Sequence, residues 1–282
     1  MAGTDTSGAT TFRGQPAVVL ATPAGDRAVV LLHGAHVVSW TPAGGREWLY
    51  LSPTSALGDG ASIRGGVPVI FPQFNRRGPD FDVPRHGFAR NRRWRLASRS
   101  EEAATFLLED DDATLGLWPH AFALRLSVRL ARKRLELGLE AVNTGSTAFA
   151  FTAALHTYLA VVDIASTRLH GLQGVRCLDT VAGTNGNGPE AALRFAGETD
   201  VIWYDLPRPL LLETPQGSLE IATSGFPDAV VWNPWAERAV SLADLPDEDY
   251  RRMLCIEAAA IGHPVSLAAG AAWLGRQVLE AR

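Results

Sequence analysis

Hydrophobic and polar residues alternate over two consecutive stretches in the middle of the chain. Every second residue is hydrophobic through 124–130, and after a basic turn at 131–134 the same alternation resumes through 135–139. A period of two places every second side chain on the same face of a β-strand. The pattern therefore predicts a β-hairpin with one face buried and the other in water.

Strand patterns recur along the rest of the chain. We predict further strands at 17–20, 28–32, 105–109, 218–223 and 229–232, and a long hydrophobic run covers 148–162. The 27 glycines and 17 prolines interrupt most windows before a helix could form. We expect one short helical turn within 244–253, and surface loops at 109–112 and 183–189. Because no change of composition marks a linker, residues 1–282 are predicted to form a single mostly-β domain of the sandwich type.

Charge and cysteine content limit the possible partners and the compartment. The net charge is −4, from 26 basic and 30 acidic residues, which argues against nucleic acid or an anionic membrane as a partner. No hydrophobic run approaches 18 residues, and residues 1–11 have neither the basic start nor the apolar centre of a signal peptide. Cys177 and Cys255 lie outside any CxxC pattern, so we expect two buried thiols and a cytoplasmic location.

Polar residues stand among glycines and prolines between positions 62 and 90. Arg64 precedes a Gly-Gly pair, Gln73 follows a proline, and His86 and Arg90 lie in the sequence HGFAR. Glycines permit a close approach of ligand or backbone, and prolines fix the path of the chain. A rigid site of this kind suits a hydroxyl-rich anion. The alternative is that Arg64 and Arg90 form structural ion pairs with carboxylates elsewhere, and we give the two interpretations about equal weight.

Two further titratable residues lie in hydrophobic surroundings. His156 is predicted to lie within a central strand, where a histidine is more often a core residue than a catalyst, although imidazole transfers protons well near neutral pH. By alternation, Leu254 and Ile256 face one side of a strand, and Cys255 and Glu257 face the other. A carboxylate in such a strand is costly unless it has a partner or a function.

Taken together and in order, these motifs resemble the aldose 1-epimerase (galactose mutarotase-like) superfamily, and within it the glucose-6-phosphate 1-epimerase branch. The resemblance extends over nearly the whole chain. Its motifs are His33-Gly34-Ala35, Ser39-Trp40, Leu51-Ser52, Ile63-Arg64-Gly65-Gly66-Val67-Pro68, Phe71-Pro72-Gln73-Phe74, His86-Gly87-Phe88-Ala89-Arg90, Leu155-His156-Thr157-Tyr158, Trp232-Asn233-Pro234, Cys255-Ile256-Glu257 and Trp273-Leu274-Gly275.

The resemblance implies an antiparallel β-supersandwich with an open sugar-binding groove. It implies that His156 is the general acid at the ring oxygen and that Glu257 is the general base at the anomeric hydroxyl. The other implied substrate-binding residues are His86 near the ring oxygen, Asp200 at the sugar hydroxyls, Arg64 and Arg90 at a phosphate, and Gln73 in the groove. The implied reaction interconverts the α and β anomers of a hexose 6-phosphate, with glucose 6-phosphate as the expected substrate. No cofactor or metal is implied, and we expect a monomer whose partner is the small sugar phosphate.

The chain departs from the family pattern at two places. Arg76 and Arg77 follow Asn75 where the family has a glycine, so they either add cations near the phosphate or belong to an exposed loop. Asp200 is followed by Val201-Ile202-Trp203, where Arg and Tyr are common in the family. His33 and His36 are three positions apart on a predicted strand and would point to opposite faces, so we interpret them as structural rather than metal-binding.

Other functions remain possible at this point. One is an epimerase for unphosphorylated aldoses, and another is a non-catalytic carbohydrate-binding module on the same fold. A metal-dependent β-barrel enzyme would need clustered ligands that the sequence does not assemble. The Arg content around Arg64 separates the first alternative, because loss of a phosphate-binding arginine should impair a phosphorylated sugar far more than glucose.

Overall fold

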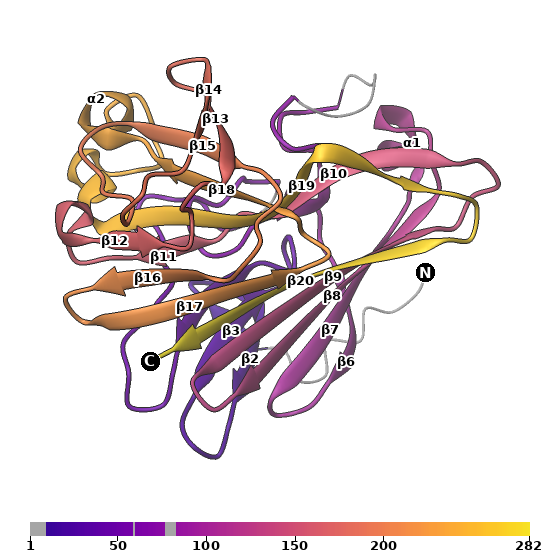
Figure 1. The fold of residues 1–282 in the computed structure, drawn as a ribbon. Coiled ribbons are helices and arrows are strands. Elements are labelled where there is room, and N and C mark those ends of the chain that lie inside the picture. Colours follow the sequence, from indigo (N-terminus) through magenta and orange to yellow (C-terminus); the bar gives the residue numbers. More distant parts are fainter. Residues whose placement is uncertain (1–9, 59, 77–82) are drawn as a thin grey trace.

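Antiparallel β-sheets dominate the structure. The computed structural model describes residues 10–58, 60–76 and 83–282. Within these residues the strands form two eight-stranded sheets and one four-stranded sheet, and neighbouring strands run antiparallel. Figure 1 shows β9, β8, β7 and β6 fanning out beside β20, with β19 and β10 crossing above them. The predicted mostly-β architecture with few short helices is confirmed.

The first eight-stranded sheet carries the candidate site. Its strands follow the order β14-β13-β15-β18-β19-β10-β5, and β11 also pairs with β19. The long strand β19 is central, because β18 pairs along one edge while β10 and β11 pair successively along the other. The bounds of these strands are β5 Val69–Ile70, β10 Phe149–Leu155, β11 Tyr158–Ala160, β13 Arg176–Asp179, β14 Thr184–Asn187, β15 Thr199–Trp203, β18 Asp228–Asn233 and β19 Met253–Leu267.

The second eight-stranded sheet contains the hairpin predicted from the alternating pattern. Strand β8 pairs with β9 so that Leu126 lies opposite Leu139 on the buried face, whereas Arg125 lies opposite Glu140 on the outer face. Each fully buried leucine contributes about 1.5–3 kcal/mol relative to an exposed one. The strands, in the order in which they pair, are β12 Arg168–His170, β16 Leu210–Thr214, β17 Gly217–Ser224, β20 Ala272–Ala281, β9 Arg134–Asn143, β8 Phe122–Ala131, β7 Ala103–Glu109 and β6 Arg95–Arg99.

A smaller sheet and a few short helices complete the fold. None of the helices in the described parts of the chain has the length and hydrophobicity needed to cross a membrane. The four-stranded sheet comprises β1 Thr10–Phe12, β2 Gln15–Ala21, β3 Arg27–Leu31 and β4 Val37–Thr41. The helices are α1 Asp112–Leu117, α2 Trp235–Ala239 and the 3₁₀ turns η1 Ala89–Asn91, η2 Ile164–Ser166 and η3 Asp247–Arg252.

The two faces of β19 have different surroundings. Leu254, Ile256 and Ala258 join the main hydrophobic core together with the buried leucines of β8 and β9. Cys255 packs on the opposite face in a smaller cluster with Tyr158 and Trp232. The alternation predicted for residues 254–257 is therefore confirmed, and it places Glu257 on the face away from the main core.

Several local predictions are confirmed and others are wrong. The predicted strands near residues 17, 28, 105, 218 and 229 are present, and the helical turn expected within 244–253 is η3. Residues 183–189 were predicted to be a loop, but Thr184–Asn187 form the edge strand β14 because their backbones pair with β13. Residues 109–112 are not simply a loop either, since Asp111 caps α1 by accepting a hydrogen bond from the Thr114 backbone.

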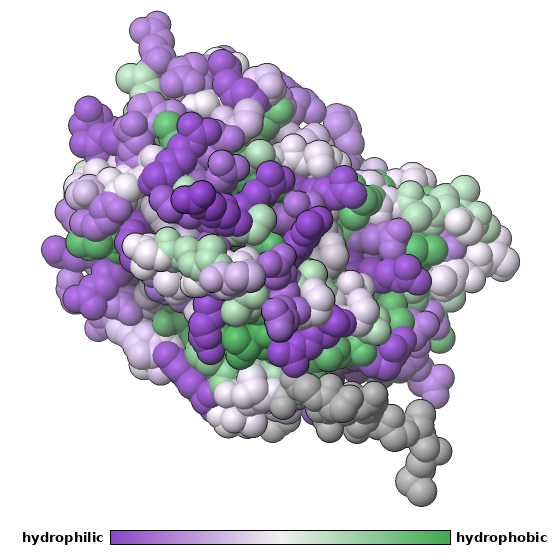
Figure 2. All heavy atoms as spheres, turned by 90° about the horizontal axis from the view of Figure 1, so that it is seen from below, coloured by the Kyte–Doolittle hydropathy of each residue, from purple (hydrophilic) through white to green (hydrophobic). Residues whose placement is uncertain are grey.

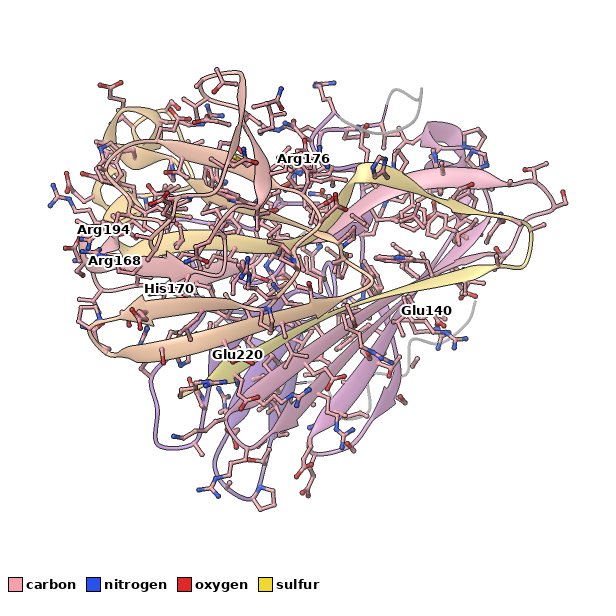
Figure 3. The ribbon with its side chains drawn as sticks, viewed as in Figure 1. Glu140, Arg168, His170, Arg176, Arg194 and Glu220 are labelled. Carbon is pink, nitrogen blue, oxygen red and sulfur yellow. The ribbon has the colours of Figure 1, made fainter. Side chains whose placement is uncertain are left out.

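One face of the molecule, the one drawn in Figure 2, is mainly hydrophilic. Viewed from below, hydrophilic residues cover much of the molecule, with hydrophobic residues in smaller areas between them (Figure 2). His170 on β12 lies among the charged side chains of the outer sheet (Figure 3), where its Nε2 is 2.8 Å from Glu213 Oε2 on β16. His170 and Glu213 therefore form a contact at the surface, and neither residue lines the pocket described next.

Candidate active site

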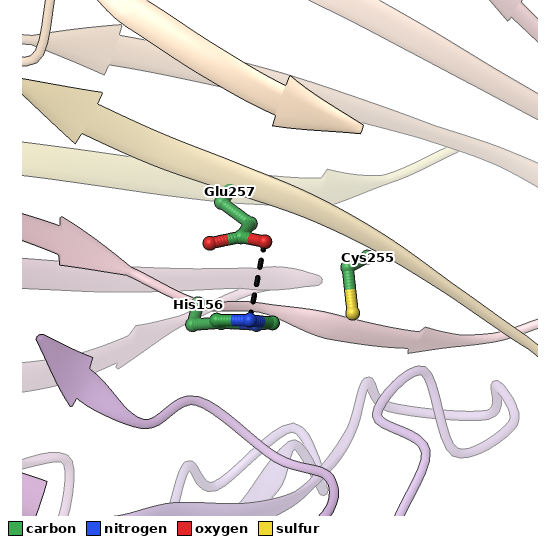
Figure 4. Close-up of side chains that lie close together, drawn as sticks. All are labelled: His156, Cys255 and Glu257. Carbon is green, nitrogen blue, oxygen red and sulfur yellow. Dashed lines mark ion pairs between the residues drawn. The ribbon is translucent and has the colours of Figure 1, made fainter. Parts of the chain in front are cut away.

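His156 and Glu257 come together through strand pairing. Leu155 at the end of β10 pairs with Ala258, and Tyr158 at the start of β11 pairs with Cys255. The same register places His156 opposite Glu257, so that the two side chains lie on the same face of the sheet. His156 Nε2 is 3.2 Å from Glu257 Oε1 (Figure 4), and the two side chains are only 9% and 1% exposed.

His156 lies in the break between β10 and β11, which the sequence did not predict. The hydrophobic run at 148–162 was expected to place His156 inside a strand, but it lies between two strands. Thr157 points to the other side, where its Oγ1 donates a hydrogen bond of 2.6 Å to Gln277 Oε1 in the core. The backbone of His156 donates to the Pro68 carbonyl, which fixes the histidine without a continuous ladder.

A pocket of about 150 Å³ opens in front of this pair. Glu257 Oε2 and His156 Nδ1 are buried there without a hydrogen-bond partner among the described residues. Buried polar atoms are normally paired, so these two atoms are available to a ligand. The lining residues are Ser62, Ile63, Arg64, Phe74, Asn75, Arg85, His86, Arg90, His156, Tyr158, Asp200, Val230, Trp232, Arg238, Leu242, Asp244 and Glu257.

His86 forms the second histidine of the pocket. It adopts φ = +66°, and the adjacent Gly87 adopts φ = +69°. A Cβ on Gly87 would lie 1.9 Å from the Phe71 carbonyl oxygen, so only glycine fits beside His86. The backbone N–H of Asn75 donates to His86 Nδ1, which leaves Nε2 as the atom that carries the proton of the neutral ring.

Arg64 is held by partners from distant parts of the chain. Its Nε and one terminal nitrogen each lie 3.1 Å from Asp244 Oδ1, and the other terminal nitrogen donates to the Tyr158 hydroxyl. The Tyr158 ring stacks on the His156 imidazole with centroids 4.8 Å apart. The His36 ring fixes the loop behind Arg64 through a 2.7 Å hydrogen bond between Nε2 and the Gly65 carbonyl. Arg64 is thereby linked to His156 through the ring of Tyr158.

His33 and His36 are structural, as their hydrogen bonds show. His33 Nε2 lies 2.8 Å from the Ala61 carbonyl oxygen, and His36 is fully buried beside Gly65. They flank a turn between β3 and β4 rather than lying on one strand. The prediction that they point to opposite faces of a strand is therefore wrong, whereas the interpretation as structural residues agrees with their contacts. Both therefore help to fix the segment that carries Arg64.

Burial governs the titration of the central pair. Burial and the negative charge of Asp200 raise the pKa of Glu257 well above its usual value. Burial and the charges of Arg90 and Arg64 lower the pKa of His156 well below its usual value. Both shifts favour the uncharged forms.

His86 and Asp200 follow the same physical rule. Burial, followed by repulsion from Arg90, Arg85 and Arg64, lowers the pKa of His86 to about 2. Burial raises the pKa of Asp200, which lies on β15 opposite Trp232 of β18. The lowered pKa of His86 favours its neutral form.

The other residues expected at the site are distributed as follows. Arg64, His86, Arg90 and Asp200 line the pocket with His156 and Glu257, whereas Gln73 is absent from the lining. The Gln73 amide instead donates to the carbonyls of Val83 and Pro84, and so it holds the segment that leads to His86.

Arg76 is exposed outside the lining residues, and Arg77 lies outside the described residues. Within the described residues, the segment that replaces the family glycine therefore adds no positive charge to the pocket.

Sequence reasoning missed several residues of the pocket. Tyr158 had a detectable signal, because it lies two positions after His156 and a strand repeats every two residues. Arg85 also had one, because it directly precedes His86. Asp244 and Arg238 had none, since their partners in the pocket are far away in sequence. Asn233, by contrast, is structural: its amide donates to the carbonyls of Tyr250 and Met253.

Three potential metal ligands lie close together at the floor of the site. Their ligand atoms, from His156, Cys255 and Glu257, are all within 4.8 Å of one another (Figure 4), a grouping that the sequence did not reveal. Zinc accepts all three kinds of ligand. However, burial raises the pKa of the Cys255 thiol well above its usual value, and arginines line the same pocket and repel a dication. The donor set does not fit a resident metal, and we assign none.

Comparisons with known proteins agree with this geometry. The family model described as aldose 1-epimerase matches residues 16–280. A protein of Cenchrus ciliaris named "Putative glucose-6-phosphate 1-epimerase" is 33% identical over 269 residues, which cover 90% of this chain and 81% of that protein. A protein of Escherichia coli K12 with the same name is 36% identical over 241 residues, covering 83% and 79%.

Solved structures give the same result for the fold. A crystal structure from Salmonella typhimurium, described as "a putative mutarotase", superposes with a TM-score of 0.87 at 29% identity, covering 97% of this chain and 93% of that one. The shared fold is the galactose mutarotase-like sandwich. From the family match over residues 16–280 and from the identity to these relatives, this chain belongs to the aldose 1-epimerase family, and it is an isomerase that acts on a sugar.

Proposed function

We propose that this enzyme interconverts the α and β anomers of a hexose 6-phosphate, with glucose 6-phosphate as the preferred substrate. The observation that carries the proposal is the buried His156–Glu257 contact of 3.2 Å facing a pocket lined by arginines. The names of the relatives from Cenchrus ciliaris and Escherichia coli support the same substrate. Guanidinium groups suit a phosphate because each can donate two parallel hydrogen bonds.

The proposed reaction opens and recloses the sugar ring. The reactive form is the less favoured one, in which the proton of the pair lies on His156 rather than on Glu257. In that form the Glu257 carboxylate removes the proton from the anomeric hydroxyl, while the His156 imidazolium protonates the ring oxygen. The ring C–O bond breaks, the aldehyde rotates about its C1–C2 bond, and the reverse transfers close the ring on the other face. One acid and one base contribute about 10²–10⁴-fold each. No electron transfer occurs, so the mechanism requires no cofactor.

Burial of the pair favours the ring-opening step. That step converts the charged pair, carboxylate and imidazolium, into a neutral acid and a neutral imidazole. The shifted pKa values of Glu257 and His156 both favour this neutral form. The site therefore stabilises the protonation state that accompanies the open-chain sugar, the form closest to the high-energy intermediate.

The remaining pocket residues orient the substrate in this proposal. Neutral His86 donates a hydrogen bond near the ring oxygen, and Asp200 binds sugar hydroxyls. Arg64 and Arg90 donate hydrogen bonds to the phosphate. Gln73 acts through the segment that it holds, because its amide is already committed to the carbonyls of Val83 and Pro84.

We also propose a monomeric, single-domain, cytoplasmic enzyme. The site sheet joins strands that lie between residues 69 and 267, which supports a single domain. Cys177 and Cys255 are free and buried, which fits a reducing compartment.

Exchange spectroscopy tests the function directly. The rates of anomer exchange of glucose 6-phosphate, galactose 6-phosphate and glucose are measured in parallel by NMR, with and without enzyme. We expect the largest acceleration for glucose 6-phosphate. Equal or faster exchange of glucose would favour the epimerase of unphosphorylated sugars, and exchange at the buffer rate with all three would favour a carbohydrate-binding module.

A further inference from the structure

The arginines that line the pocket differ in how their charges are balanced. Arg64 is paired with Asp244 at 3.1 Å, and Arg238 is paired with Glu198 at 3.2 Å. A carboxylate at this distance largely cancels the charge of a guanidinium seen by a third group. These two arginines therefore offer hydrogen bonds to a ligand but little uncompensated positive charge.

Arg85 and Arg90 have no carboxylate partner among the described residues. One terminal nitrogen of Arg90 lies 3.3 Å from the Arg85 carbonyl, and Arg90 Nε is buried without a hydrogen-bond partner in the described parts of the chain. Arg85 is exposed, and within the described residues its guanidinium forms no ion pair. The two cations flank His86, one directly before it and the other four residues after it.

The pKa values of Arg64 and Arg90 are shifted in opposite directions, although both side chains are partly buried. Burial opposes the charge of Arg64, but Tyr158 and Asp244 outweigh that effect and raise its pKa above the usual value. Burial also opposes the charge of Arg90, and attraction from Tyr158 and Glu257 does not outweigh burial together with repulsion from Arg64 and Arg85, so that its pKa is lowered. Arg90 therefore lies where an anion would relieve an existing repulsion.

The position of Arg85 matches the far end of a substrate. Arg85, Arg90 and Ser62 line both the pocket in front of Glu257 and an adjoining surface groove, so they lie where the two meet. A sugar whose anomeric carbon is at His156 and Glu257 would extend its opposite end toward such a boundary. A phosphate monoester carries a charge of about −1.5 to −2 at neutral pH and needs more than one uncompensated cation.

We propose that Arg85 is a specificity-determining residue, which together with Arg90 supplies the uncompensated charge that binds the phosphate of the substrate. Arg64 adds hydrogen bonds and positions Tyr158 against His156. This inference rests on the proposed function, and it goes beyond it by assigning the preference for phosphorylated over unphosphorylated sugar to a residue on the rim of the pocket.

The test compares Arg85→Gln with Arg238→Gln. Both arginines are exposed and line the same pocket, so both variants remove one positive charge without disturbing the core. The probe is 1,5-anhydroglucitol 6-phosphate, which carries the phosphate but has no anomeric hydroxyl and cannot react. Calorimetry gives its Kd, and exchange NMR gives kcat/KM for glucose 6-phosphate and for glucose.

We expect Arg85→Gln to weaken binding of the probe about 10- to 100-fold, as for the loss of a charge-assisted hydrogen bond. The loss in kcat/KM should be at least tenfold greater for glucose 6-phosphate than for glucose. Arg238→Gln should weaken the probe less than about threefold, since its charge is already balanced. Arg85→Lys, which keeps the charge but not the planar fork, should recover part of the loss.

Equal effects of Arg85→Gln and Arg238→Gln on the probe would overturn the inference, because a general field rather than a local contact would then be responsible. Equal losses for glucose 6-phosphate and glucose in Arg85→Gln would also overturn it. If the wild-type enzyme does not accelerate exchange of glucose 6-phosphate, the proposed function fails, while the calorimetric comparison still decides the role of Arg85.

Discussion

Replacing Glu257 by Gln removes the proposed base while keeping the shape of the side chain. The carboxyl group is 1% exposed and lies 3.2 Å from His156 Nε2, so the substitution leaves the packing intact and removes only the ability to take a proton. We expect a fall in kcat of about 10²–10⁴-fold, the usual contribution of a general base. His156→Gln should cause a loss of similar size.

The double variant tests whether the two residues act as a unit. If both transfers occur in one step, removing the second residue adds little to the loss caused by the first. We therefore expect the double variant to be no more than a few-fold slower than either single variant. Additive losses would mean that the two groups act in separate steps.

The same substitution should increase stability. The pKa of Glu257 is raised in the folded protein, so the folded state binds more protons than the unfolded state above the usual value of 4.5. Stability then falls as the pH rises from that value toward the folded pKa, by about 1.4 kcal/mol for each unit of the shift. Glu257→Gln removes this loss, and its advantage in free energy of unfolding should grow between pH 5 and about pH 7.

Two measurements decide this prediction, and a neighbouring residue provides the control. Exchange NMR with glucose 6-phosphate gives kcat, and chemical denaturation at pH 5 and pH 7 gives the free energy of unfolding. Cys255→Ala changes a buried residue on the same strand face that has no part in the proposed chemistry, so it should keep kcat within a few-fold. Near-wild-type turnover by Glu257→Gln would refute the assignment of the base, and a pH-independent difference in stability would refute the raised pKa.

Three further predictions concern pH, metals and a structural amide. Glucose lacks a titrating phosphate, so its kcat/KM plotted against pH should be bell-shaped. The acidic limb should lie well below the usual histidine value of 6.5, because the pKa of His156 is lowered. An acidic limb at or above pH 6.5 would contradict this. Turnover measured by polarimetry should be unchanged by prolonged dialysis against EDTA, whereas inactivation that zinc reverses would make His156, Cys255 and Glu257 a metal site. Asn233→Ala should lower the free energy of unfolding by about 1–3 kcal/mol, because it leaves the buried carbonyls that its amide now binds without that partner; an unchanged denaturation midpoint would count against this role.

Much of the fold could be predicted because the strand pattern is local. The alternation around residues 124–139 determines which face of β8 and β9 is buried, whatever the rest of the chain does. The same rule placed Glu257 on the face opposite Ile256. Where backbone pairing decided the outcome, as for Thr184–Asn187, composition was misleading, since glycine and asparagine can form a strand when a neighbouring edge offers hydrogen bonds.

The sequence by itself determined the strand faces and the order of motifs that resembles one family, because these depend on residue spacing. Only the tertiary structure decided which charges meet. Asp244 balances Arg64 across 180 positions, and the register of β19 against β10 and β11 sets His156 opposite Glu257. Charge compensation depends on distance in space, which residue spacing does not encode, and so the difference between Arg64 and Arg85 becomes visible only in the folded chain.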